Sequence, residues 1–179
     1  MSEVHTIGLD LAKSVFQAHG ADPSGGVVFR RRLRRSQVLS FFAAQPKCLV
    51  AMEACGSAHY WGRELTRLGH EVRLIPPIYV KPFVKRQKND VADAEAICEA
   101  ATRPTMRFVA VKSEERQGIA VILRTRELLI RQRTQIINAL RGHLAEFGVI
   151  VPKGVSNTGK LMDHICDPAT ALPETARDA

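Results

Sequence analysis

The order of strand-like and helix-like segments is the feature that most restricts how this chain can fold. Three consecutive segments, residues 4–10, 15–19 and 27–33, have the patterning of β-strands and are joined by short connections. Two further strand-like segments, residues 48–53 and 71–75, alternate with helix-like segments. Neighbouring strands followed by strand–helix alternation predict one mixed β-sheet covered by helices.

Helix-like segments follow the third, fourth and fifth strands of this order. They are predicted at residues 36–44, 57–68 and 90–101, and residues 106–111 have the pattern of a short edge strand. Residues 48–53 form a continuous apolar run that ends in an acid, as expected for a strand buried on both faces. This order matches the ribonuclease-H-like fold, an α/β class with helices flanking a mixed sheet.

A long helix is predicted from residue 113 to about residue 147. Ser113 can cap its first turn, and Gly148 ends it. At 1.5 Å per residue it is roughly 50 Å long, so part of its apolar seam is expected to contact another chain. The seam consists of Ile119, Ile122, Leu129, Ile136, Leu140, Leu144 and Phe147.

These patterns divide the chain into three segments. Residues 1–112 are expected to form the sheet domain, and residues 113–148 a coiled-coil-like oligomerisation helix. Residues 149–179 are rich in Pro, Gly and Asp with weak patterning, and are expected to be a linker or a frayed end.

Composition narrows the function classes. Lysine and arginine number 26 against 18 acidic residues, and the resulting net charge of +8 favours a polyanionic partner. No apolar run approaches the roughly 18 residues of a membrane-spanning helix. The N-terminus lacks the pattern of a secretion signal. The four cysteines lack zinc-site spacing and are expected to be reduced thiols in a cytosol.

Four carboxylates occupy positions where they can meet. Asp10 ends the first strand and Glu53 ends the fourth, while Asp90 and Asp93 open the helix after the fifth strand. Strand ends and a helix start can converge at one edge of a sheet, where clustered carboxylates need cations to stay ionised. Mg²⁺ prefers such oxygen ligands, and two ions about 4 Å apart are the usual arrangement for cutting phosphodiesters.

Each carboxylate also has an ordinary interpretation. Asp90 and Asp93 are favourable in the first turn of any helix, Asp10 is compatible with a turn, and Glu53 with a loop. Spacing alone leaves both interpretations open.

Four motifs resemble the DEDD transposases of bacterial insertion sequences and, more narrowly, the recombinases guided by a bridge RNA. They occur in the family's order at residues 8–13, 52–61, 79–85 and 88–97, and residues 103–109 fit the same pattern. The resemblance covers about residues 5–150. It implies a RuvC-like catalytic fold and a bacterial cytoplasmic protein.

The resemblance also implies a site and partners. It places an acidic tetrad that would hold Mg²⁺ on Asp10, Glu53, Asp90 and Asp93. It implies a DNA transposase with a guide RNA that selects donor and target DNA, and assembly into dimers and tetramers. The family's serine nucleophile comes from a C-terminal domain, so residues 1–179 are expected to be incomplete as an enzyme.

Basic residues near these carboxylates are candidates for contacts with nucleic acid, because a basic loop beside a metal site suits a phosphate backbone. They are Lys13, Lys81, Lys85, Arg86 and Lys88, together with Arg124, Arg126, Arg131 and Arg133 of the long helix. A solvated surface is the ordinary alternative for each group.

Two other features have ordinary interpretations of comparable weight. The arginines at 30, 31, 32, 34 and 35 alternate between the faces of a strand and are not expected to form a single patch. A charged edge strand explains them as well as RNA binding does. Trp61 is expected in the core rather than in a base-stacking surface.

Three functions remain in competition. The first is the Mg²⁺-binding part of an RNA-guided DNA recombinase. The second is a Holliday-junction-resolvase-like nuclease that cuts with water and needs no RNA. The third is a non-catalytic, dimeric module that binds nucleic acid. The sequence leaves open the DNA target, the RNA and the number of subunits.

Overall fold

The computed structural model describes residues 3–85 and 90–178, with only the backbone of Asp90 and Val91. The chain forms two compact units, Met1–Arg116 and Gln117–Ala179. The first unit contains the β-sheet, and the second contains most of the long helix.

A five-stranded mixed sheet forms the centre of the first unit. Its strands are β1 (Thr6–Asp10), β2 (Val15–Ala21), β3 (Val27–Arg34), β4 (Leu49–Glu53) and β5 (Glu71–Ile75). The strand order is β3-β2-β1-β4-β5, in which β2 is antiparallel to both β1 and β3, and β4 is parallel to both β1 and β5. This is the mixed, ribonuclease-H-like sheet that the order of segments predicts.

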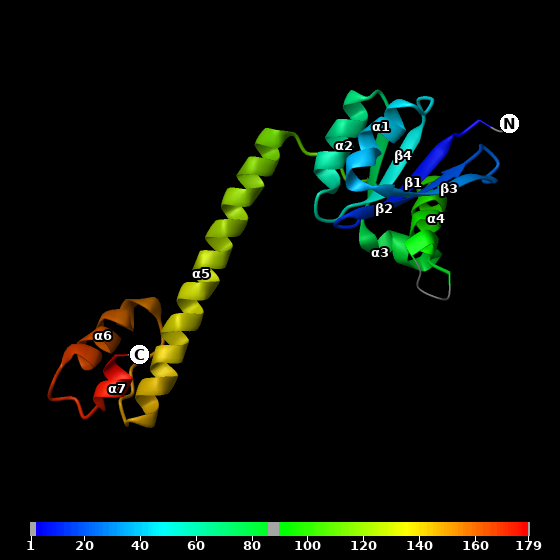
Figure 1. The fold of residues 1–179 in the computed structure, drawn as a ribbon. Coiled ribbons are helices and arrows are strands. Elements are labelled where there is room, and N and C mark those ends of the chain that lie inside the picture. Colours follow the sequence, from blue (N-terminus) through cyan, green and yellow to red (C-terminus); the bar gives the residue numbers. More distant parts are fainter. Residues whose placement is uncertain (1–2, 86–89, 179) are drawn as a thin grey trace. The chain divides into compact units, whose positions relative to one another are not determined.

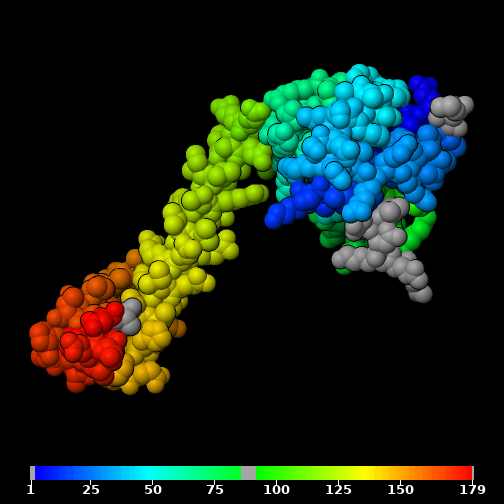
Figure 2. Space-filling view, in the orientation of Figure 1, coloured from blue at the N-terminus to red at the C-terminus, as the bar shows by residue number. Residues whose placement is uncertain are grey.

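Helices cover both faces of the sheet (Figure 1). One face carries α1 (Val38–Ala43), which follows a short 3₁₀ turn, and α2 (Ala58–Arg67). These two helices lie side by side in the space-filling view (Figure 2). The other face carries α3 (Pro77–Val80) and α4 (Asp90–Ala101). The bounds of α4 are those predicted from the sequence.

The apolar core is correspondingly divided into two layers. Ile7, Leu9 and Met52 pack with Trp61 and Leu65 of α2 on one face of the sheet. On the other face, the sheet residues Ala51 and Ile75 pack with Ile97 and Ala100 of α4. The strands β1 and β4 are therefore buried on both sides, as the continuous apolar run of β4 indicates.

A glycine in β1 allows α4 to lie unusually close to the sheet. A Cβ atom at Gly8 would lie 2.2 Å from the backbone oxygen of Ala94 and 2.6 Å from the backbone nitrogen of Cys98. Neither backbone atom can move without the helix, so only glycine fits at this crossing. The contact sets the height of α4 above β1.

The predicted edge strand at residues 106–111 is reduced to one isolated bridge. Val109 pairs with Leu74 of β5, and its amide donates to the Leu74 carbonyl at 2.8 Å. Val109 and Val111 pack against the apolar layer that includes Trp61. Side-chain packing holds this segment in place, and the strand prediction is wrong beyond that single bridge.

The second unit is built on the C-terminal part of α5 (Glu114–Glu146), as Figure 1 shows. Residues 149–178, predicted as a linker or a frayed end, include the short helices α6 (Thr158–Cys166) and α7 (Glu174–Arg177). Widely spaced apolar residues of weak local pattern enclose a small core there. They are Ile137, Leu144, Val151, Leu161 and Leu172. No helix in the described ranges has the length and apolar character needed to cross a membrane.

Candidate active site

Asp10 and Glu53 end neighbouring parallel strands at one edge of the sheet. The register of β1 and β4 runs to the pair Leu9–Met52, which immediately precedes these two carboxylates. Side chains alternate along a strand, so Asp10 lies on the face of Gly8 and Glu53 on the face of Ala51. Both of those residues face α4, and both carboxylates are half-buried.

Asp93 reaches the same place from α4. It lies one helical turn before Ile97, which is fully buried against the sheet. Burial raises the pKa of the Glu53 carboxyl, and the negative charge of Asp93 raises that pKa further. The Asp93 carboxylate is therefore close enough to disfavour the ionisation of Glu53.

Cys55 is a neighbour of this cluster that the sequence patterns do not reveal. Burial raises the pKa of the Cys55 thiol, and the negative charges of Glu53 and Asp10 add to the effect. The thiol thus lies near both strand-end carboxylates. The available signal is its position two residues after Glu53, at the end of a buried strand.

The turn between β4 and α2 is conformationally strained. Ser57 precedes the first residue of α2 and has φ 70°, the one positive value found at a non-glycine position in the described ranges. Such conformations cost about 1–3 kcal/mol and cluster at functional sites. Here the strain lies four residues after Glu53.

The remaining member of the predicted tetrad is only partly described. Asp90 is the first residue of α4, one turn before Asp93, and its side chain lies outside the described residues. Within the described part of the chain, no three His, Cys, Asp or Glu side chains form a metal-binding group. Asp10, Glu53 and Asp93 are gathered at one edge of the sheet without completing such a group among themselves.

The predicted basic residues have different environments. Lys13 and Lys81 are exposed in the sheet unit, whereas Arg86 and Lys88 lie outside the described residues. Lys85 donates a hydrogen bond to Glu95 of α4, which also accepts one from Arg30 at 3.1 Å. The predicted arginines of α5 are all exposed: Arg124, Arg126, Arg131 and Arg133.

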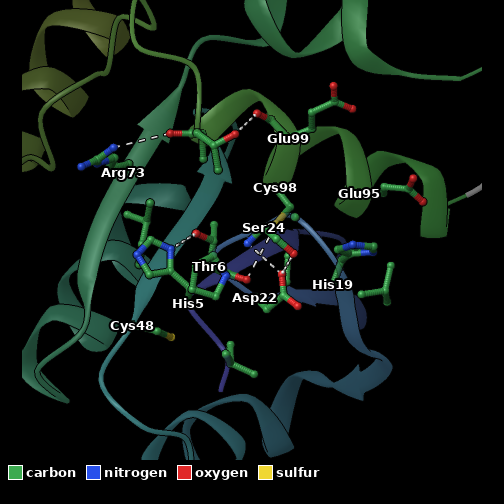
Figure 3. Close-up of a pocket in the computed structure, with 18 of the residues that line it drawn as sticks. His5, Thr6, His19, Asp22, Ser24, Cys48, Arg73, Glu95, Cys98 and Glu99 are labelled. Atoms are coloured by element: carbon green, nitrogen blue, oxygen red, sulfur yellow. Dashed lines mark hydrogen bonds between the residues drawn. The ribbon is translucent and has the colours of Figure 1, made fainter. Parts of the chain in front are cut away.

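A wide cavity of about 1160 Å³ lies at the opposite edge, where the parallel strands begin (Figure 3). Asp10, Glu53 and Asp93 do not line it. Acidic and basic side chains mix on its walls, among them Glu99 and Arg73. The cavity is therefore separate from the carboxylate cluster, and its walls favour no single ligand charge.

Comparison with known proteins identifies the family. Residues 7–149 match the DEDD transposase family of the IS110 type, described as transposase. The chain belongs to this DEDD transposase family. The match includes every member of the acidic tetrad that the resemblance predicts.

The relatives of this chain are named as transposases. A Pseudomonas aeruginosa protein named "Probable family 20 transposase" is 60% identical over 160 residues, which cover 89% of this chain and 47% of that protein. The transposase for insertion sequence element IS1328 of Yersinia enterocolitica is 44% identical over 156 residues, covering 87% of this chain and 47% of the relative. The chain spans about half the length of these curated relatives.

One solved structure is also similar to this member of the family. It is T. thermophilus RuvC in complex with a Holliday junction substrate, at 12% sequence identity and a TM-score of 0.44. The similarity covers 58% of this chain and 98% of the RuvC chain.

Proposed function

We propose that this chain is the Mg²⁺-binding catalytic part of an insertion-sequence transposase that acts in RNA-guided DNA recombination. The observation that supports this most directly is the raised pKa of Glu53 beside Asp93, at the edge where Asp10 ends β1. Packed like charges of this kind are expected where a cation normally offsets them.

The donor set fits a hard divalent cation. Asp10, Glu53, Asp90 and Asp93 supply oxygen ligands, which Mg²⁺ prefers. The raised pKa of Cys55 keeps its thiol protonated in the metal-free chain, so the charged donors of the cluster are the carboxylates. Bound Mg²⁺ would activate the attacking oxygen and stabilise the leaving oxygen of a phosphodiester.

Exposed basic residues of the sheet unit would hold the nucleic acid. Lys13 and Lys81 are exposed and available to phosphates. The ion pair between Lys85 and Glu95 is solvent-exposed on the lysine side, and exposed pairs of this kind are weak. Lys85 can therefore exchange its carboxylate partner for a phosphate at little cost.

The finer parts of the proposal concern partners. A guide RNA is supported by the family resemblance, by the net charge of +8 and by the exposed arginines of α5. Self-association is supported by exposed apolar side chains along α5, including Ile122 and Leu129. A serine supplied by a further C-terminal domain would complete strand exchange.

Mg²⁺-dependent stabilisation tests the metal site directly. The thermal unfolding transition of the wild-type chain should move to higher temperature as Mg²⁺ is added. At a hundredfold excess over Kd, binding adds about 2.7 kcal/mol to the free energy of unfolding. Glu53→Gln should abolish most of this shift. Glu127→Gln makes the same chemical change at an exposed position of α5 and should retain it. An equal Mg²⁺ response in the wild type and Glu53→Gln would refute the assignment of Glu53.

A further inference from the structure

A second cavity of about 750 Å³ opens at the sheet edge where Asp10 and Glu53 lie. Val15 begins β2 opposite Arg34, the last residue of β3, so both lie at the edge where β1 and β4 end. The cavity is on the α1 and α2 side of the sheet, since Tyr60 and Trp61 of α2 line it. The carboxylate cluster is on the α4 side of the same edge.

The charged residues that line this cavity are all basic. They are Lys13, Arg34 and Arg35, with no carboxylate among the described lining residues. Arg34 ends β3 and Arg35 begins the 3₁₀ turn, so the chain changes direction between them. The two arginines therefore line one cavity, although strict strand alternation predicts that neighbouring arginines face opposite ways.

Hydrogen bonds fix this corner of the chain. The Arg35 amide donates to the Ser14 carbonyl at 2.9 Å, and the Arg34 amide donates to Oε1 of Gln37 at 2.9 Å. The backbone that carries both guanidinium groups is thus tied to the β1–β2 connection and to its own turn. With the backbone fixed, only side-chain freedom is lost when these arginines bind an anion.

An aromatic surface adjoins the basic residues. The rings of Tyr60 and Trp61 meet edge to face with centroids 5.1 Å apart, and the Arg35 guanidinium lies 5.1 Å from the Trp61 ring centroid. Trp61 is buried, but Tyr60 is 41% exposed. Among the described residues, the buried Nε1 of Trp61 has no acceptor. A ligand with a planar ring and anionic oxygens matches the aromatic surface and the basic residues beside it.

We propose that this cavity binds an unpaired nucleotide of the DNA strand, with its base stacked on Tyr60 and its phosphates held by Lys13, Arg34 and Arg35. The identity of the strand as DNA rests on the proposed function. The requirement for an unpaired base follows from the chemistry, because bases stacked within a duplex do not offer a free face to Tyr60. The site would hold a strand beside the carboxylates without touching the metal.

The single tryptophan of the chain makes the site directly observable. Trp61 is the only tryptophan, so intrinsic emission reports on this cavity. Titration with an oligothymidine of about 15 nucleotides should change that emission, and anisotropy of the same labelled strand should give the same Kd. Tyr60→Ala should weaken binding by roughly 5- to 150-fold, whereas Tyr60→Phe should retain it.

Matched arginine variants test the phosphate contacts. Arg34→Ala should lower the slope of log affinity against log salt by about 0.7, the value for one contact with a single strand. Arg32→Ala, also exposed on β3 but outside the cavity, should leave the slope and the Trp61 response unchanged. Equal losses in the two variants would overturn the assignment of Arg34.

Three other outcomes would overturn the proposal. They are wild-type affinity in Tyr60→Ala, an equally tight duplex with the same Trp61 response, and an oligouridine that binds more tightly than oligothymidine. The last result would reassign the strand to RNA. Glu53→Gln should keep the Trp61 response while losing the Mg²⁺ shift. A wild type with the Trp61 response but no Mg²⁺ shift would refute the proposed metal site and still support this cavity.

Discussion

Replacing Gly8 by alanine should displace α4 from the sheet. The added Cβ would lie 2.2 Å from the Ala94 oxygen and 2.6 Å from the Cys98 nitrogen, both well inside an ordinary contact. Relief requires α4 to shift by about 1 Å, because both obstructing atoms belong to the helix backbone. The shift would also carry Asp93 away from Asp10 and Glu53.

The expected cost is at the upper end of the range for overpacked cores. Extra methylene groups in a well-packed interior cost typically 1–3 kcal/mol, and a rigid helix backbone cannot turn aside as a side chain can. We therefore expect Gly8→Ala to lose about 3 kcal/mol. With a urea m-value of about 1.5–3 kcal/mol/M, the midpoint should fall by roughly 1–2 M.

Two other glycines provide a graded comparison. A Cβ at Gly20 would lie 2.5 Å from a ring atom of Phe29, a partly buried side chain that can move, so Gly20→Ala should cost about 1 kcal/mol. Nothing lies within 4 Å of a Cβ at Gly118 of α5. Gly118→Ala should leave the sheet unit unaffected and strengthen the helix by about 1 kcal/mol.

Urea unfolding followed by Trp61 fluorescence measures the sheet unit selectively. Trp61 is the only tryptophan and is buried in that unit, so its transition does not report on the second unit. Circular dichroism of the same samples reports the helix of the Gly118 variant. A Gly8→Ala midpoint within about 0.3 M of the wild type would refute the close packing of α4 on β1.

Three further predictions follow from charge and exposure. The pKa of Glu53 is raised in the folded chain, so ionising this carboxyl lowers the folding stability once the pH exceeds the ordinary glutamate pKa of 4.5. Glu53→Gln should therefore raise the urea midpoint of the metal-free chain at pH 7 but not at about pH 3. Asp93→Asn should give part of that increase in the urea midpoint. A lower urea midpoint for Glu53→Gln at pH 7 would contradict the expected direction of the effect. On α5, Leu129→Glu should reduce the mass measured by sedimentation, because it would bury an unpaired charge in the seam. Thr134→Glu, on the opposite side of the helix, should leave that mass unchanged. A wild type that is monomeric at high concentration would exclude self-association through this seam. Lys81→Ala should lower the salt slope of duplex binding by about 0.9, and an unchanged slope would remove Lys81 from the DNA surface.

The elements of this fold were readable from local patterns. Strand periodicity, continuous apolar runs and helix-start signals depend on neighbouring residues, so they predict β1 to β5 and the bounds of α4, Asp90–Ala101. The same patterns place Asp10 and Glu53 at strand ends. Parallel pairing of β1 and β4 then brings those ends to one edge of the sheet.

The neighbours of each functional side chain were decided by packing. Gly8 sets the approach of α4, Cys55 lies beside Glu53 and Asp10, and Lys85 pairs with Glu95 ten residues along the chain. None of these contacts leaves a periodic signal, because each depends on the position of another element. Trp61 lies in the core as predicted, yet it also lines a basic cavity, since β3 turns sharply at its last residue. Sequence periodicity specifies which face of an element is apolar, whereas the distance between two elements depends on how their side chains interlock.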